Sequence, residues 1–165
     1  MLIKRLLFIL INLFASSGFA QPGALNPVKW EMSWEELSET EGNLVFTATM
    51  DPKWHIYSQK QSGDGPIPTS FSLLITPEWE PVGTVQEPEP ENVYTEVFQS
   101  NVLMFSNQAV FKQKIKRKNK KEFFVLGDLE FMSCNDVSCL PPRIIKINLK
   151  VNGAKSGVKL KEVKD

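Results

Sequence analysis

The chain has 165 residues, with 19 basic and 19 acidic side chains and no formal net charge. Because of this balance, the chain is not one of the strongly basic proteins that bind nucleic acid through their charge, so we expect no nucleic acid as a partner. The residues after position 20 are enough to bury one hydrophobic core without the metals or several disulfides that small scaffolds need.

The first twenty residues have the layout of a secretory signal peptide. Lys4 and Arg5 precede an apolar run at 6–14, and small residues lead to Ala20. A membrane anchor is the alternative, but a largely apolar run of nine residues falls short of the roughly 20 that a spanning helix needs. We predict that residues 1–20 are cleaved before Gln21, leaving 17 basic and 19 acidic residues in an exported chain that is not inserted in the membrane.

Strand patterns dominate the remaining sequence. "NLVFTATM" at 43–50 and "RIIKINLKV" at 143–151 alternate apolar and polar side chains, which predicts strands with one face in a core and one in water. Turn-forming segments separate four further β-branched or aromatic runs, at 69–75, 80–85, 108–115 and 122–132. Six or more short strands predict an all-β domain at 21–151, a β-sandwich.

One segment of this pattern has a second interpretation. "SWEELSETEG" at 33–42 carries Ser33 three residues before Glu36, a capping-box pattern that could begin a short helix. The flanking "VKWEM" and the spread of 11 prolines favour a strand and a hairpin instead. The polar segment 152–165 is expected to be a flexible tail.

Charged residues gather in two places. Residues 112–121 contain seven basic side chains, and six glutamates lie between Glu78 and Glu96. We interpret these groups as a solvated hairpin turn and a solvated loop. The alternative is a pair of charged docking surfaces, because opposite patches steer encounters between proteins.

The two cysteines of the chain, Cys134 and Cys139, lie in "FMSCNDVSCLPP" at 131–142. In an exported protein such a pair most often forms a disulfide. A ring of this size stabilises a domain by only roughly 2 kcal/mol, so a structural brace and a redox-active pair remain equally open. "NDVS" and the prolines that follow Leu140 indicate a surface loop, which an exchanging disulfide requires.

A metal site is the weakest interpretation of the same residues. Structural zinc sites use four nitrogen or sulfur ligands, and the chain offers two thiols and one histidine, His55. Copper(I) could use the two cysteines with a methionine such as Met132 or Met104. We expect His55, in "KWHIYS", to pack at the end of a strand, and we expect neither a metal nor another cofactor.

Four segments in this order resemble a known family. "DPKWHIYSQ" at 51–59, "GPIPTSF" at 65–71, "VFQSNVLMF" at 97–105 and the cysteine loop ending in "CLPP" are similar to the N-terminal periplasmic domain of the thiol:disulfide interchange protein DsbD. The resemblance extends over roughly residues 26–151. It implies an immunoglobulin-like β-sandwich in the periplasm that carries electrons as one component of a protein-disulfide reductase system.

The resemblance also implies partners and roles for residues. A membrane-embedded or thioredoxin-like donor would reduce the cysteine pair, which would then reduce thioredoxin-fold proteins such as disulfide isomerases or those of cytochrome c maturation. Cys139 corresponds to the cysteine that forms the mixed disulfide, and Cys134 to the one that resolves it. Phe98, in "EVFQS", corresponds to an aromatic that covers the pair, and Glu96 to an acidic residue near it.

Three departures from the family pattern qualify these expectations. Four residues separate the cysteines here, whereas five are usual in the family, and Val97 stands where a second acidic residue is common. The sequence ends at Asp165 without a membrane region or a thioredoxin-like domain, so donor and acceptor are expected to be separate chains. The alternatives are a non-enzymatic binding module with a structural disulfide, or a copper or cytochrome-maturation chaperone.

Overall fold

The structure, a computed structural model, describes residues 25–61, 63, 65–151 and 157–159. The predicted signal peptide at 1–20 lies outside the described residues. The described part of the chain forms strands and contains no helix. The strands are β1 (Val28–Glu36), β2 (Glu41–Met50), β3 (His55–Tyr57), β4 (Ser70–Leu74), β5 (Trp79–Pro81), β6 (Glu91–Thr95), β7 (Ser100–Ser106), β8 (Gln108–Arg117), β9 (Phe123–Phe131), β10 (Ser133–Cys134), β11 (Arg143–Val151) and β12 (Gly157–Lys159).

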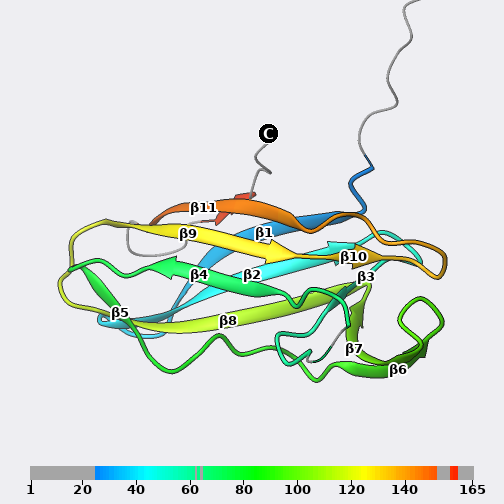
Figure 1. The fold of residues 1–165 in the computed structure, drawn as a ribbon. Helices are drawn as coiled ribbons and strands as arrows, with labels where there is room; N and C mark the ends of the chain where they lie inside the picture. Colours follow the sequence, from blue (N-terminus) through cyan, green and yellow to red (C-terminus); the bar gives the residue numbers. More distant parts are fainter. Residues whose placement is uncertain (1–24, 62, 64, 152–156, 160–165) are drawn as a thin grey trace, which may run out of the picture.

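Two antiparallel sheets form the layers of a sandwich (Figure 1). One has the strand order β12-β1-β2-β8-β5, and the other has the order β11-β9-β4. Their facing sides share one hydrophobic core, in which Trp30 of β1 meets Phe131 of β9 with ring centroids 5.6 Å apart. The all-β sandwich expected from the sequence is confirmed.

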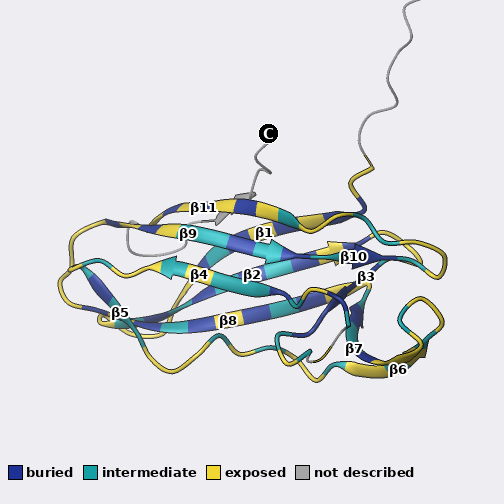
Figure 2. Ribbon diagram, viewed as in Figure 1, coloured by how far each residue is buried: buried dark blue, intermediate teal, exposed yellow. Residues whose placement is uncertain are grey.

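Alternation of side chains along the strands builds this core (Figure 2). The strand predicted at 43–50 is β2, and the strand predicted at 143–151 is β11. Each fully buried aliphatic or aromatic side chain contributes about 1.5–3 kcal/mol relative to an exposed one. The residues of these two strands that face the core are the predicted ones, Leu44, Phe46, Ala48, Met50, Ile145, Ile147, Leu149 and Val151.

The other strand predictions are confirmed with one difference. The runs at 69–75, 108–115 and 122–132 contain β4, β8 and β9. In the run at 80–85 the strand β5 ends at Pro81, because Gly83 adopts a left-handed φ of 70° that turns the chain. The short strands β3, β6, β7 and β10 were not predicted as strands, and they make up the third sheet.

The segment at 33–42 is a strand and a hairpin, as favoured, and the helix alternative is wrong. Strand β1 continues to Glu36, and the backbone N–H groups of Leu37 and Ser38 both donate to the carbonyl of Glu41 at 3.0 Å. The Ser38 hydroxyl accepts from the N–H of Glu41 at 3.1 Å, so Ser38 stabilises the turn of this hairpin. Of the predicted tail at 152–165, the structure describes Gly157–Lys159, which pair with β1 as β12.

The basic cluster at 112–121 lies along the outer side of β8 and the turn that follows it. Four of its lysines have carboxylate partners within 2.7–3.2 Å on neighbouring strands and turns. Such exposed pairs contribute little energy each, and they agree with a solvated face better than with an open basic docking surface. These ion pairs are Lys112–Glu35, Lys114–Glu41, Lys118–Glu80 and Lys120–Glu39.

The third sheet, with the order β10-β3-β7-β6, lies at one end of the sandwich (Figure 1). It has a small hydrophobic cluster of its own, built on the buried residues Tyr57, Val102 and Cys134. Ile56, the middle residue of β3, belongs to the main core instead. Strand β3 therefore joins the main core to the end of the molecule that carries the cysteines.

In the described part of the chain, no helix has the length and apolar character needed to cross a bilayer.

Candidate functional site

Cys134 and Cys139 form a disulfide across a tight hairpin, residues 133–140, which we call the cysteine hairpin. The two cysteines face each other as an antiparallel bridge with their Cα atoms 4.0 Å apart. The N–H of Asn135 donates to the carbonyl of Ser138, and that of Leu140 donates to the carbonyl of Ser133, both at 2.9 Å. The disulfide thus joins a non-hydrogen-bonded pair between two ladder bonds, where side chains approach most closely.

The residues between the cysteines explain how a shortened loop still closes this ring. The side-chain oxygen of Asn135 accepts from the N–H groups of Val137 and Ser138 at 2.9 and 2.8 Å, which is the Asx turn that asparagine favours. The turn leaves Asp136 exposed and Val137 86% exposed at its tip. Four residues therefore suffice for the disulfide, despite the departure from the family spacing.

The two sulfur-bearing residues have different environments. Cys134, in β10, is 1% exposed and belongs to the small cluster, whereas Cys139 is half-buried. After Cys139 the chain leaves the sheet through the exposed Pro141 and Pro142, which have no N–H to donate to a ladder. Cys139 is therefore the more exposed residue of the pair.

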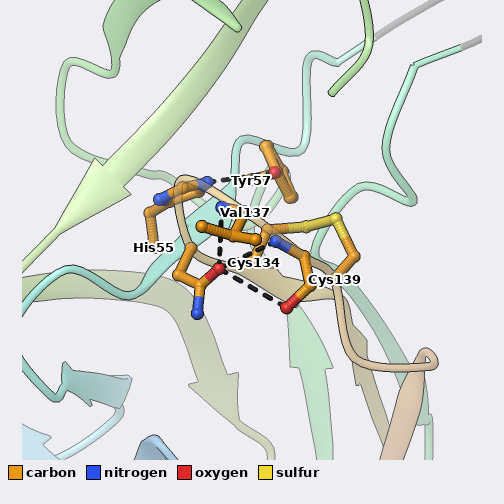
Figure 3. Close-up of a disulfide and its surroundings, with 7 residues drawn as sticks. His55, Tyr57, Cys134, Val137 and Cys139 are labelled. Atoms are coloured by element: carbon orange, nitrogen blue, oxygen red, sulfur yellow. Dashed lines mark hydrogen bonds between the residues drawn. A yellow bond between two sulfur atoms is a disulfide. The ribbon is translucent and has the colours of Figure 1, made fainter. Parts of the chain in front are cut away.

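Strand β3 forms the interior side of the site. His55 is the register partner of Cys134, and Tyr57, two residues along, lies on the same face of the strand (Figure 3). The Nε2 atom of His55 is 3.1 Å from the hydroxyl of Tyr57, in a buried hydrogen bond. The position expected for His55, packed at a strand end, is confirmed, since it is the first residue of β3 and is 7% exposed.

Burial shifts both titratable groups on β3 toward their neutral forms. Burial lowers the pKa of His55 below its ordinary value, and the charge of Asp136 partly opposes this shift. Burial raises the pKa of Tyr57, so its hydroxyl keeps its proton at all ordinary pH values. Sequence reasoning did not identify Tyr57 as a site residue. The signal for it was its spacing of two from His55 on one strand, which places both side chains on one face.

The turn between β6 and β7, residues 96–99, supplies the remaining aromatic of the site. Phe98 packs against the small cluster that contains both cysteines, and its ring is edge-on to that of Tyr57 with centroids 6.0 Å apart. Gln99 adopts a left-handed φ of 50°, which turns the chain sharply into β7. Glu96 and Val97, in the same turn, are exposed. The structure therefore brings Phe98 to the small cluster that includes Cys134 and leaves the Glu96 side chain in solvent.

The sulfur atoms of two methionines also lie in this region. Met104 of β7 and Met132, just before β10, are partly buried and pack against the same small cluster as the cysteines. Within residues that the structure describes, no group of three or more histidine, cysteine, aspartate or glutamate side chains is arranged to hold a metal ion.

Comparison with known proteins gives one family and two related structures. The family model for the N-terminal domain of the thiol:disulfide interchange protein DsbD matches residues 24–150. The reduced DsbD N-terminal domain of Neisseria meningitidis is 14% identical, with a TM-score of 0.54, and the alignment covers 84% of this chain and 96% of that one. The N-terminal periplasmic domain of ScsB from Proteus mirabilis is 15% identical, with a TM-score of 0.58, covering 80% of this chain and 49% of that one. No curated protein matches the chain.

These comparisons confirm the resemblance seen in the sequence. At such low identity the two structures establish the fold, which is the expected immunoglobulin-like β-sandwich. The family model spans nearly all the described strands, from before β1 to the last residue but one of β11, and includes both cysteines. The chain belongs to the family of N-terminal domains of the thiol:disulfide interchange protein DsbD.

Proposed function

We propose that the chain is a periplasmic thiol–disulfide exchange domain that cycles between the Cys134–Cys139 disulfide and the dithiol. The observation that carries this proposal is the unequal exposure of the two cysteines within a family of thiol–disulfide interchange domains. A disulfide with one accessible sulfur can form a mixed disulfide with another protein, while its buried partner stays ready to resolve it.

The chemistry assigns a separate role to each cysteine. In reduction, a partner thiolate attacks the sulfur of Cys139, the Cys134–Cys139 bond breaks, and Cys134 leaves with the electron pair. A second partner thiolate then attacks the partner sulfur of the mixed disulfide and releases Cys139 as a thiolate. In the reverse direction Cys139 attacks a disulfide of the acceptor, and Cys134 closes the ring. Each cycle passes two electrons and requires no bound cofactor.

Thioredoxin-fold proteins and a membrane-embedded thiol reductase on separate chains are the partners that this role implies. Disulfide isomerases and cytochrome c maturation proteins are the proposed acceptors. The surface around Cys139 suits such docking, because Val137 is 86% exposed and Pro141 and Pro142 are also exposed. Exposed apolar side chains beside a reactive group are typical of protein interaction sites.

Phe98 acts in this proposal as a cap over the resting disulfide. Its packing against the cluster of Tyr57, Val102 and Cys134, against which Cys139 also packs, supports this role. A ring at this position limits the approach of small thiols and oxidants, and a docked partner would displace it. Glu96, which is exposed in the same turn, is proposed to place a negative charge at the rim, where it disfavours thiolate formation until a partner docks.

The test uses single-cysteine variants and a purified thioredoxin-fold disulfide isomerase that lacks its own resolving cysteine and is activated as a mixed disulfide with thionitrobenzoate. Cys134→Ala is expected to displace thionitrobenzoate rapidly and to form a stable covalent complex on a non-reducing gel. Cys139→Ala, whose remaining thiol is buried, is expected to react much more slowly. A faster reaction of Cys139→Ala would reverse the roles, and no complex with either variant would refute the exchange function.

The packing of two methionines beside the cysteines favours a second candidate function. Reduced Cys134 and Cys139 with Met104 or Met132 would present soft sulfur ligands of the kind that bind copper(I). A copper chaperone would bind one copper(I) ion tightly in the reduced form and lose it when either cysteine is replaced. Retention of copper(I) binding in Cys134→Ala or Cys139→Ala, or no binding by the reduced protein, would eliminate this candidate.

A further inference from the structure

The buried position of Cys134 creates a requirement for proton transfer. When the disulfide opens by attack on Cys139, the sulfur of Cys134 leaves as a thiolate at a residue that is 1% exposed. An uncompensated charge at such a depth costs several kcal/mol, so it has to be neutralised or paired. In the reverse reaction the buried thiol must lose its proton before it can attack. Water reaches this residue poorly, so a protein group has to carry the proton.

His55 is placed to meet this requirement. It lies opposite Cys134 in the register of β3 and β10, and paired residues of neighbouring strands project from the same face with Cβ atoms about 4.5–5.5 Å apart. Figure 3 shows His55 and Tyr57 together beside Cys134 and its disulfide. The hydrogen bond between Nε2 and the Tyr57 hydroxyl fixes the imidazole and engages one ring nitrogen.

We propose that His55 is the general base that takes the proton of the Cys134 thiol, and that Tyr57 is its positioning residue. The inference rests on the proposed exchange function and adds a residue to its mechanism. Nothing in the cysteine spacing points to it. It follows from the register of two short strands that bring the single histidine of the chain against the buried cysteine.

The proposed step conserves both protons and electrons. In the mixed disulfide between Cys139 and a partner, the neutral imidazole of His55 accepts the proton of the Cys134 thiol and becomes imidazolium. The Cys134 thiolate attacks the sulfur of Cys139, the bond to the partner breaks, and the partner sulfur leaves with the electron pair. The imidazolium then releases its proton to that sulfur or to solvent. The products are the Cys134–Cys139 disulfide and the partner thiol.

The groups around His55 agree with a base that is neutral at rest. From its own strand it faces Tyr57, which stays protonated because burial raises its pKa. On the neighbouring strand β7 its register partner is Ser106, which carries no charge. The cysteine hairpin contributes Cys134 and the carboxylate of Asp136. Burial lowers the pKa of His55, so the imidazole is free to accept a proton, and Asp136 stabilises the imidazolium that forms.

Ring closure can be measured without any partner protein. The reduced domain, free of any purification tag, is mixed with excess dithionitrobenzoate: Cys139 releases one thionitrobenzoate in a bimolecular phase, and Cys134 releases the second in a unimolecular phase. For His55→Gln we expect the second phase to be at least about tenfold slower at neutral pH and to approach the wild-type rate as pH rises toward the ordinary pKa of a thiol, about 8.5. The first phase should change much less.

Ser106→Ala is the matched control, because Ser106 is the other cross-strand neighbour of His55 and carries no proton acceptor of comparable basicity. Its two phases should keep their wild-type rates and pH profile. An unchanged second phase in His55→Gln, or equal slowing of both phases, would overturn the role of His55. The readout is independent of the trapping experiment, so failure of one proposal is distinguishable from failure of the other.

A titration of the wild-type protein covers the case in which the variant does not fold. Because the chain has one histidine, the ring C–H signals of the tag-free protein report His55 alone in a proton NMR spectrum. If His55 exchanges a proton with Cys134, the two groups titrate as a coupled pair, and the reduced protein will show a different His55 titration curve from the oxidised one. Identical curves in the two states would refute the proposal.

Discussion

Replacement of Phe98 by alanine tests whether the 96–99 turn is a cap. Truncation of a fully buried phenylalanine costs about 3–5 kcal/mol. Phe98 is half-buried, and it packs against Tyr57 and the rest of the small cluster, so the loss of cap packing should be about 1–2 kcal/mol. If the disulfide reacts with small thiols only when the cap opens, the opening equilibrium and the reduction rate should both rise by a factor of about 5–30.

The assay is the reduction of the oxidised protein by excess dithiothreitol, quenched with acid at timed intervals and followed by alkylation and mass measurement. Val97→Ala is the matched control, because this neighbouring side chain is 43% exposed and does not belong to the small cluster. Its reduction rate should match the wild type. A wild-type rate for Phe98→Ala, in a protein whose thermal unfolding shows that it is folded, would mean that the turn does not shield the disulfide.

Three further predictions concern stability. Leu129 is a fully buried core residue, so Leu129→Ala should lower the free energy of unfolding, measured by urea denaturation, by about 2–5 kcal/mol. Leu37 is 51% exposed, so Leu37→Ala should change the same quantity by less than about 0.5 kcal/mol. Glu87→Gln should cost about 1–3 kcal/mol in the same assay, because the carboxylate is 2% exposed and accepts from the hydroxyl of Ser58 at 2.6 Å; a neutral result would mean that the charge is dispensable there. The folded-state pKa of His55 is lowered, so the unfolded chain binds more protons below its ordinary pKa of about 6.5. Stability should therefore fall on acidification through that range, and the slope should be smaller in His55→Gln.

The parts of the fold that could be predicted are those that depend on local alternation. Strands β2, β8, β9 and β11 each bury every second side chain, so their sequences carry both the strand and its core face. Strands β3 and β10 have three and two residues, too few for a period to be visible. They form because β3 pairs with β7 and β10 pairs with β3, and the residues that determine this pairing are distant in the sequence.

The candidate site divides in the same way. The cysteine pair and its turn could be predicted from residues that are adjacent in the sequence, since Asn135 favours the turn that closes the ring. The position of Phe98 beside the pair came only from the family resemblance, because no local pattern links the 96–99 turn to the cysteine hairpin. His55 was expected at a strand end, but its alignment with Cys134 depends on the register of two strands that were not predicted.

The arrangement of the two hydrophobic clusters gives a physical reason for the different behaviour expected of the two cysteines. Strand β3 is anchored through Ile56 in the main core, so His55, Tyr57 and the adjoining Cys134 share the stability of the sandwich. Phe98 lies in a hairpin turn outside the main core and packs against the small cluster alone. Local opening costs least where few buried apolar contacts are lost. The proposed cap would therefore open, and Cys139 would change partners, while the buried cysteine and its proposed base keep their positions, which is the division that the proposed exchange requires.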